Sequence, residues 1–425
     1  MKQTIFELKN KMKVILVPSH KSPVVSVQMW VKTGSADEKK NEEGISHFIE
    51  HLVFKGTEKY KVGEIANIIE ASGGELNAYT SFDQTVFYVT ISKNYLDTAV
   101  DVIAQMMGHP TFDQDEVHSE REVVCEEIKM GIDSPSRSAS QLMFKSVFKK
   151  HAYGIPVIGY EKNVRSWPVK KIQKYFNSRY VPSNMTLIIS GDFNLKETKK
   201  DVTDVFSKFA SHKLIKVKRV KEPIQKAPTF SGATKDIVET TLQMAWPAPN
   251  AKHKDVPALE VLAMILGQGE TSRLYSKLRL ENSLANNVSA YTYNPVDSGL
   301  FTISSKLTDQ SMPELFTALF TEIERVLKYG ITWEELKKAV INISSEQFYS
   351  IETVDGIANK IGTEYFYLND TKAYEKYLSK IQQLQPKDIQ KVAVKYLDIN
   401  KTNFSILNKK TKVDQIASLK EGLKI

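Results

Sequence analysis

The stretch VVSVQMWVKTGSADEKKNEEGISHFIEHLVFKGT, residues 24–57, predicts a β-strand, a polar loop and a helix in that order. Over residues 24–32 apolar side chains recur at every second position, which is typical of a strand with one buried face. Over residues 45–53 they recur at the spacing of a helix with one buried stripe. This succession predicts a domain in which helices pack against a sheet.

The same succession returns in the second half of the chain, where residues 240–271 read TTLQMAWPAPNAKHKDVPALEVLAMILGQGET. When the Gln-Met pair of each stretch is aligned, HFIEH (47–51) falls on LAMIL (262–266). A pattern that recurs at a long period indicates internal duplication. We therefore expect two homologous halves, of which only the first carries polar residues on this helix.

The length of 425 residues also favours more than one domain, because single cores stop growing at about 250–300 residues. The expected fold class is α+β, with two homologous αβ domains that each pack an antiparallel sheet with helices. We expect an N-terminal domain at 1–211 and a C-terminal domain at 231–425. The segment between them, 212–230, is basic, contains prolines and is weakly periodic, and we interpret it as a linker.

Composition and charge exclude several classes of protein. Hydrophobic residues make up 41% of the chain and charged residues 25%, as in globular rather than disordered proteins. The net charge of +8 comes from lysines spread over the whole length, and no element clusters basic with aromatic residues, so we expect no nucleic-acid partner. The one cysteine, Cys125, permits neither an intramolecular disulfide nor a cysteine-based zinc cluster.

Membrane and targeting segments are also missing from the sequence as given. No apolar run approaches the roughly 18–20 residues that a membrane span requires. The run MKVILVP (12–18) is too short and too late for a signal peptide. We expect no membrane span and a cytoplasmic location, unless a leader has been removed.

The helix expected over 45–53 carries His47, Glu50 and His51. Two histidines four residues apart project from one face of a helix, and this spacing lets two imidazole nitrogens converge on one metal ion. Glu50 flanks the same face and could take a proton from water there. Incidental histidines on a helix surface are the alternative, but the neighbouring apolar stripe would leave such polar groups beside a buried face, at a cost in free energy.

A third ligand is expected from the helix predicted over DEVHSEREVVCEEIKMG, residues 115–131. Glu120 and Glu127 lie seven residues apart and share one face of this helix, next to its buried stripe. His118 is a rival ligand. Spacing alone does not choose between Glu127 and Glu126.

These motifs together resemble the pitrilysin family of zinc metallopeptidases, which includes insulin-degrading enzyme and the mitochondrial processing peptidase, and in particular its short bacterial-type members. The resemblance covers essentially the whole chain. It rests on motifs in the same order: GISHFIEHLVFKGT (44–57), GGELNAYTSFDQTVFYV (73–89), EREVVCEEI (120–128), NMTLIISGDF (184–193) and ETSRLYSKLR (270–279).

The resemblance implies a role for each residue of the metal motif. According to this resemblance, His47, His51 and Glu127 bind one zinc ion (Zn2+) per chain, and Glu50 is the general base. Glu120 matches a further carboxylate that orients the site and assists catalysis. The N-terminal domain would then be the zinc-bearing catalytic domain, and the two domains together would form half of a clam-shell.

Substrate contacts are implied as well. Asn77 and Ala78 match an edge strand along which a peptide substrate pairs by β-addition. Arg279, in the half without the metal, matches a substrate-binding arginine that the family follows, seven residues later, with a tyrosine.

This chain departs from that pattern, because Asn286 stands where the tyrosine is expected. Either a nearby tyrosine, Tyr291 or Tyr293, takes over the role, or a second chain supplies the complete pair. Short members of the family work as homodimers or heterodimers, so a homologous partner chain is expected.

The resulting prediction is a zinc-dependent endopeptidase that cleaves short or unfolded peptides inside a dimeric chamber. The alternative is a catalytically weak or inactive core or processing subunit that binds peptides and needs a homologous partner.

Overall fold

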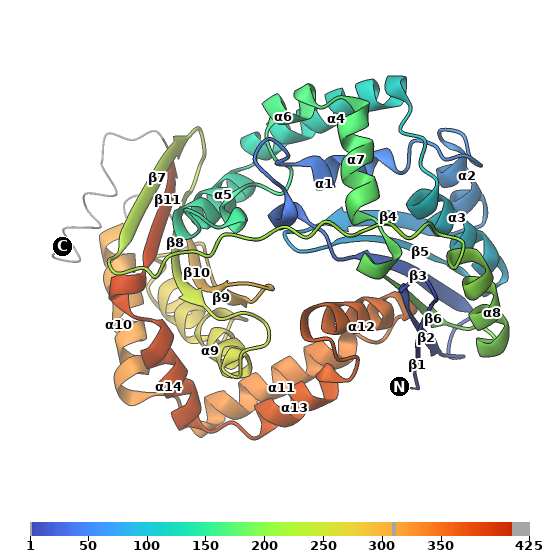
Figure 1. Cartoon of the computed structure of the whole chain (residues 1–425). Coiled ribbons are helices and arrows are strands. Elements are labelled where there is room, and N and C mark those ends of the chain that lie inside the picture. Colours follow the sequence, from blue (N-terminus) through green and yellow to red (C-terminus); the bar gives the residue numbers. More distant parts are fainter. Residues whose placement is uncertain (1, 308–311, 410–425) are drawn as a thin grey trace. The chain divides into compact units, whose positions relative to one another are not determined.

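The computed structural model describes residues 2–307 and 312–409, so residues 308–311 and 410–425 of the expected C-terminal domain lie outside the described part. Figure 1 shows the succession of strands and helices along the chain. The chain folds into two compact units. Unit 1 comprises Met1–Met130, Ile155–Arg219 and Tyr349–Phe366, and unit 2 comprises Gly131–Gly154, Val220–Phe348 and Tyr367–Ile425.

Unit 1 is built on a six-stranded sheet with the strand order β1-β2-β6-β3-β5-β4. β2 and β6 pair in parallel, and the other neighbours pair antiparallel. β4 lies at an edge, so one side of its backbone has no neighbouring strand in the sheet. The strands are β1 (Thr4–Glu7), β2 (Lys13–Pro18), β3 (Val24–Val31), β4 (Glu75–Thr80), β5 (Thr85–Ser92) and β6 (Met185–Gly191).

Helices cover both faces of this sheet, which explains why β6 is buried at every position. One face of β3, with Val25, Val27 and Met29, belongs to a large core that includes residues of α1 and α3. The helices of unit 1 are α1 (Ile45–Leu52), α2 (Glu64–Ala71), α3 (Leu96–Gly108), α4 (Gln114–Asp133), α6 (Glu161–Ser166), α7 (Val169–Arg179), α8 (Leu195–Phe206) and α12 (Val354–Leu368).

The opposite face of the sheet is covered by α12, a helix from late in the sequence (Figure 1). Trp30 of β3 belongs to the same buried cluster as Ile357 and Ile361 of this helix. Gly362 brings the helix backbone so close to Trp30 that a Cβ there would lie 2.2 Å from a ring atom. A hydrogen bond also holds the first turn of α12. The side-chain amide of Gln28 donates it to the Asp355 carboxylate at 2.9 Å.

Unit 2 contains a five-stranded sheet with the order β7-β11-β8-β10-β9. β11 and β7 pair in parallel and the remaining neighbours pair antiparallel, so the sheet repeats the pattern of β2-β6-β3-β5-β4 in unit 1. This common order confirms the expected α+β class with two similar sheet-and-helix units. The strands are β7 (Thr229–Lys235), β8 (Thr240–Ala248), β9 (Asn287–Tyr293), β10 (Gly299–Leu307) and β11 (Asn403–Lys409).

The helices of unit 2 follow the same plan. α9 follows β8 as α1 follows β3, and α5, from before the expected linker, lies against β7, β8 and β11 (Figure 1). The helices are α5 (Pro135–Val147), α9 (Val256–Gly267), a π-helical turn (Tyr275–Glu281), α10 (Met312–Tyr329), α11 (Trp333–Tyr349), α13 (Ala373–Gln382) and α14 (Pro386–Tyr396).

Each unit therefore takes one helix from the other half of the sequence. The boundaries at 211 and 231 stay a prediction, but unit 1 contains α12 from beyond them and unit 2 contains α5 from before them. Among the described residues, no helix is both long enough and apolar enough to cross a bilayer.

Candidate metal centre

The position of α1 is fixed at its N-terminus. Gly44, just before the helix, has a φ of 102°, and a Cβ there would lie 2.4 Å from the carbonyl oxygen of Ile158, so glycine is required. The Glu38 carboxyl group accepts hydrogen bonds from the amides of Gly44 (2.7 Å) and Ser46 (2.8 Å), which satisfies free N–H groups at the start of the helix. Burial raises the pKa of Glu38 to about 8, so at neutral pH this group acts mainly as an uncharged acceptor. The first turn, which carries His47, is therefore held firmly.

The structure brings His47, His51 and Glu127 together. One ligand atom of each lies within 4.8 Å of the others, and no other such group of three was found among the described residues. Glu127 Oε2, from α4, lies 3.6 Å from Nε2 of each histidine. All three side chains are partly buried. Two imidazoles and one carboxylate from two helices are the donor set of a catalytic zinc site, which leaves one position for water or substrate.

Glu120 contacts His51 through the ring nitrogen that does not face Glu127. Its Oε1 lies 2.9 Å from His51 Nδ1, and its Oε2 lies 2.8 Å from the ammonium group of Lys55. Because a carboxylate accepts, Nδ1 carries the proton, which leaves Nε2 to face Glu127. Burial alone would lower the pKa of His51, but the hydrogen bond with Glu120 and the nearby Glu127 carboxylate raise it to about 9. The two carboxylates thus stabilise positive charge at this point.

The pKa of Glu120 itself moves in the opposite direction. Burial would raise it, but the hydrogen bonds with His51 and Lys55 lower it, so this carboxylate stays ionised. Lys55 was not singled out by the sequence, although it lies four residues after His51 and next to the end of α1.

Glu50 lies beside the cluster without belonging to it. Burial raises the pKa of its carboxyl group, because the charged form is poorly solvated there. The Thr80 hydroxyl, at the end of β4, donates a hydrogen bond of 2.5 Å to its Oε2. Sequence reasoning missed Thr80, since nothing in the pattern of a hairpin shows which side chain reaches a distant helix.

The rival third ligands lie elsewhere. The Glu126 side chain is 63% exposed and pairs with Lys129 at 2.7 Å, whereas that of Glu127 is 28% exposed and faces α1. His118 is exposed. Of these candidates, Glu127 is the one that lies with His47 and His51 in the structure.

The residues expected to bind substrate lie in both units. Asn77 and Ala78 are on β4, the edge strand that ends at Thr80. The Ala78 amide donates to the Asn77 side-chain oxygen at 2.8 Å. Arg279 lies in unit 2, on the π-helical turn, where its Nη1 donates a hydrogen bond of 2.5 Å to the Tyr275 hydroxyl.

Asn286 and the two tyrosines proposed as substitutes make other contacts. The Asn286 amide donates to Glu239 at 2.6 Å. Burial raises the pKa of Tyr291, and the ring of Tyr293 packs edge-on against Phe144. The tyrosine that contacts Arg279 is Tyr275, four residues before it, which the sequence analysis did not consider.

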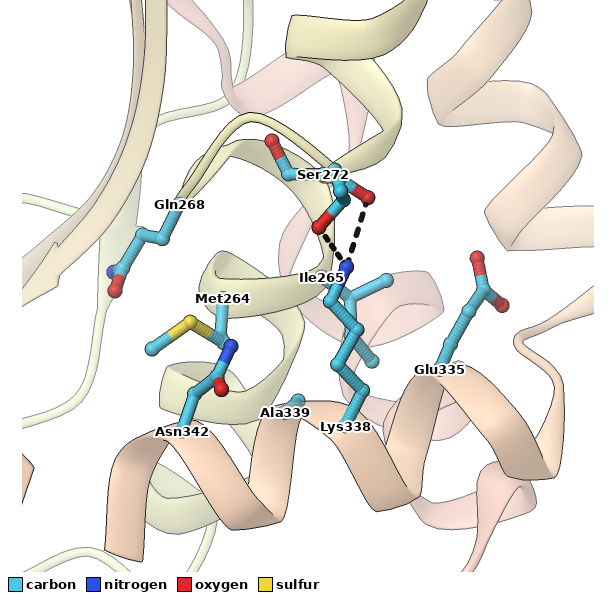
Figure 2. Close-up of a pocket in the computed structure, with 9 residues that line it drawn as sticks. Met264, Ile265, Gln268, Ser272, Glu335, Lys338, Ala339 and Asn342 are labelled. Atoms are coloured by element: carbon cyan, nitrogen blue, oxygen red, sulfur yellow. Dashed lines mark hydrogen bonds between the residues drawn. The ribbon is translucent and has the colours of Figure 1, made fainter. Parts of the chain in front are cut away.

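In unit 2, α9 holds the place that α1 holds in unit 1. Figure 2 shows the space between α9 and α11, where Met264, Ile265 and Ala339 are among the lining residues. Lys338 fills one end by donating to the carbonyl and hydroxyl oxygens of Thr271. The remaining cavity is about 30 Å³, which is room for a water molecule but not for a ligand.

An HxxEH helix with a glutamate from a second helix, set in one of two similar units, is the arrangement of an inverzincin. Residues 13–161 match the family described as Insulinase (Peptidase family M16), and residues 166–343 match the Peptidase M16 inactive domain. The chain therefore belongs to peptidase family M16, and the expected membership of the pitrilysin family is confirmed.

Known relatives share most of its length. The chain is 31% identical to the zinc protease PqqE of Helicobacter pylori, over 92% of this chain and 89% of that protein. It is 27% identical to a Bacillus subtilis protein described as the uncharacterized zinc protease YmxG, over 88% of this chain and 91% of that one. The crystal structure of a protease from Helicobacter pylori matches with a TM-score of 0.87 at 28% identity, over 96% of this chain and 99% of that chain.

Proposed function

We propose that the chain is a zinc-dependent endopeptidase that cleaves short or unfolded peptides. The observation that carries this proposal is the convergence of His47, His51 and Glu127, with Glu50 beside them. The donor set fits zinc, since two imidazole nitrogens and a carboxylate suit its coordination and the surrounding carboxylates favour positive charge. The names of the relatives support the same conclusion.

The residues of this chain have distinct tasks in that reaction. A bound zinc ion supplies Lewis acidity, which activates water and polarises a carbonyl group. Glu50 takes the proton from the attacking water and passes it to the departing amine. Thr80 holds the Glu50 carboxylate in place through its hydrogen bond. Glu120 keeps His51 in the tautomer whose Nε2 is free to bind the metal.

Substrate binding is proposed to use the free edge of β4. An extended peptide that adds to this edge is held by main-chain hydrogen bonds, which demand little of its sequence. Because Thr80 ends the strand and contacts Glu50, a peptide on this edge passes the general base. Asn77 and Ala78 supply part of this edge, so they are proposed as substrate-binding residues, together with Arg279. Folded proteins present few free strands, which favours short or unfolded substrates.

The proposal is tested by metal analysis and peptide cleavage on the purified chain. We expect about one zinc ion per chain, held by three protein ligands. Treatment with o-phenanthroline should remove both zinc and activity, and added zinc should restore them. Protein that contains no zinc and cleaves peptides regardless of the chelator would exclude the proposed function.

A second candidate is a catalytically weak subunit that needs a homologous partner chain. It is favoured by Asn286, which replaces the expected tyrosine and is engaged with Glu239. In this case the partner supplies the complete arginine and tyrosine pair, and the active form is a heterodimer that encloses peptides in a chamber. A homodimer that cleaves peptides fully, and is unchanged by Asn286→Tyr, would exclude this candidate. Size-exclusion chromatography and activity of the isolated chain decide between them.

A further inference from the structure

The first part of the segment interpreted as a linker, residues 212–219, belongs to unit 1. Its backbone is held at Ile215, whose amide donates to the carbonyl oxygen of Ser178 at 3.2 Å and whose own carbonyl oxygen accepts a hydrogen bond from the Arg179 guanidinium. The side chain of Arg219, the last residue of this unit, is only 15% exposed. Because an arginine is seldom buried without a specific partner, this one indicates a task beyond connecting two units.

Arg219 joins two turns that are distant in the sequence. Its Nε and Nη2 donate to the two carboxylate oxygens of Asp37, each at 3.0 Å, and its Nη1 donates to Asp83 Oδ1 at 2.5 Å. Asp37 ends the 3-10 turn Ser35–Asp37, and Asp83 lies in the turn between β4 and β5, where its side chain has no exposed surface. A bidentate pair of this kind fixes the direction as well as the distance between its partners.

The two turns also contact each other through their backbones. The Ser35 amide donates to the carbonyl oxygen of Ser81 at 3.1 Å, and the Ala36 amide donates to that of Phe82 at 2.8 Å. These bonds keep the turns together, and the Arg219 side chain adds a charged link between them.

Both turns continue directly into the surroundings of Glu50. On one side, Thr80 is the last residue of β4, and its hydroxyl donates to the Glu50 carboxylate at 2.5 Å. On the other side, Glu38 follows Asp37 in the chain and accepts hydrogen bonds from amides at the start of α1, the helix that carries Glu50. The donor and the acceptor of the Thr80–Glu50 hydrogen bond are thus each connected to a turn that Arg219 holds.

We propose that Arg219 is a positioning residue that acts through these two turns on the Thr80–Glu50 hydrogen bond. The inference rests on the proposed function, in which Glu50 is the general base, and it gives the segment 212–219 a part in that site. The guanidinium keeps the turns in place, so that the Thr80 hydroxyl meets the Glu50 carboxylate at hydrogen-bonding distance. Because proton transfer depends steeply on the placement of the base, a small shift of either turn should slow the reaction while zinc stays bound.

Arg219→Lys is the principal variant, since lysine keeps the positive charge but cannot donate to two carboxylates as a fork. On the zinc-loaded full chain it should lower kcat for a peptide about three- to tenfold, the range of one lost hydrogen bond, with KM and zinc content close to wild type. Arg165→Lys is the matched control, because Arg165 also bridges two carboxylates, those of Glu122 and Glu161, but is exposed. It should change neither kcat nor the melting temperature.

The coupling between Arg219 and Thr80 separates positioning from general stability. In the Thr80→Val background, where the hydrogen bond to Glu50 is already absent, Arg219→Lys should lower kcat no further. An arginine that only stabilised the fold would lower kcat by the same factor in both backgrounds. A second variant, Arg219→Ala, leaves room for a free guanidinium ion, so millimolar guanidinium should restore part of its rate, whereas tetramethylammonium should not. If Arg219→Ala does not fold, Arg219→Lys decides alone.

Hydrogen exchange tests the same link without any reaction. Because the amides of Ser35 and Ala36 donate from one turn to the other, they should exchange faster in Arg219→Lys than in wild type, while those of β6 should not change. A wild-type kcat in Arg219→Lys, an undiminished effect in the Thr80→Val background, or unchanged exchange at Ser35 and Ala36 overturns the inference. If the zinc-loaded wild-type chain never cleaves peptides, the proposed function fails, and the exchange of these two amides still decides whether Arg219 holds the turns.

Discussion

We propose different tasks for three glutamates, on α1 and α4, because their surroundings differ. Glu127 faces both histidines, Glu120 is bound by His51 and Lys55, and Glu50, which is partly buried, accepts a hydrogen bond from the Thr80 hydroxyl. The same carboxyl group is therefore proposed as a metal ligand in Glu127, as a hydrogen-bond acceptor that orients a ligand in Glu120, and as a proton carrier in Glu50. Each assignment can be tested by removing charge without changing size.

Glu50→Gln should keep zinc and lose turnover by several orders of magnitude, because it removes the proton acceptor and leaves the ligand set intact. Zinc content and the cleavage rate of one peptide are measured on the same preparation. Thr80→Val is the companion variant, which should lower the rate by about tenfold, since it only loosens the Glu50 carboxylate. A Glu50→Gln protein that cleaves at the wild-type rate would remove Glu50 from the mechanism.

Glu127→Gln should lower zinc occupancy, because the amide is a far weaker ligand than a carboxylate. Glu126→Gln is the matched control one residue away, and it should bind zinc like wild type, since Glu126 is exposed and pairs with Lys129. Zinc per chain after dialysis at fixed free zinc is the measurement. If Glu126→Gln loses zinc while Glu127→Gln retains it, the third ligand is misassigned by one residue.

At the scale of elements, the start of α11 is stabilised by a group of three side chains. The Thr332 hydroxyl accepts from the Glu335 amide, and the Glu335 carboxylate accepts from the Thr332 amide, which is a capping box. Arg273 adds two hydrogen bonds to the same carboxylate, at 2.5 and 2.7 Å. Partial burial alone would raise the pKa of Glu335, but the bonds from Arg273 and Thr332 lower it.

This shift predicts a pH dependence. A carboxyl group whose pKa is lower in the folded chain adds stability above its unfolded pKa, near 4.3, and loses that contribution as the pH falls through its folded pKa. Glu335→Gln should lower the free energy of unfolding by about 2 kcal/mol at pH 7 and flatten its decline below about pH 4.5. Melting temperatures from pH 7 to pH 3 test this. Glu334→Gln, at an exposed neighbouring position, should leave the profile unchanged.

The contact between α12 and β3 predicts a second effect at this scale. Gly362→Ala raises helix propensity by about 1 kcal/mol, but the added Cβ would meet the buried ring of Trp30. Overpacking of this kind costs about 1–3 kcal/mol, so the net change should be destabilising. Gly131→Ala in α4 is the control, because a Cβ there meets its nearest neighbour at an ordinary 3.6 Å. If Gly362→Ala melts at or above the wild-type temperature, the helix does not pack as described.

The sequence predicted the strand–helix succession, the duplication and the HxxEH helix, because these features depend on periodicity and spacing within short segments. It did not predict that α5 and α12 cover the sheet of the other half, since long-range packing leaves no mark in local patterns. Thr80, Lys55 and Tyr275 were missed for the same reason. Each acts by contacting a side chain that the sequence did identify, and contact is a property of the fold.

At the scale of the whole molecule, the sheet of unit 2 repeats the order of five of the six strands of unit 1. Among the described residues, candidate metal ligands lie on α1, after β3, and not on α9, after β8. The corresponding helix of unit 2, α9, is almost wholly buried. Duplication thus yielded one unit whose helix bears the candidate ligands and one whose helix only packs.

The helix that each unit takes from the other half of the sequence predicts how fragments behave. A fragment of residues 1–211 lacks α12, so Trp30, Val86 and Ile188 lose their apolar cover. We expect it to bind the dye ANS and to aggregate, and a synthetic peptide of residues 349–368 to reduce both effects. The same peptide with Gly362→Ala should be less effective. A fragment that stays monomeric and does not bind ANS would show that the sheet needs no cover on this face.

The late position of α12 also bears on synthesis at the ribosome. The sheet of unit 1 is complete once residue 191 has emerged, but the helix that covers its second face emerges well over 150 residues later. At about 5–20 residues per second, roughly 10–30 s pass before that face can be covered. During this interval the nascent chain presents an apolar surface to the cell. Trigger factor or a similar ribosome-bound chaperone should therefore raise the yield of the full chain, and slower translation should lower it.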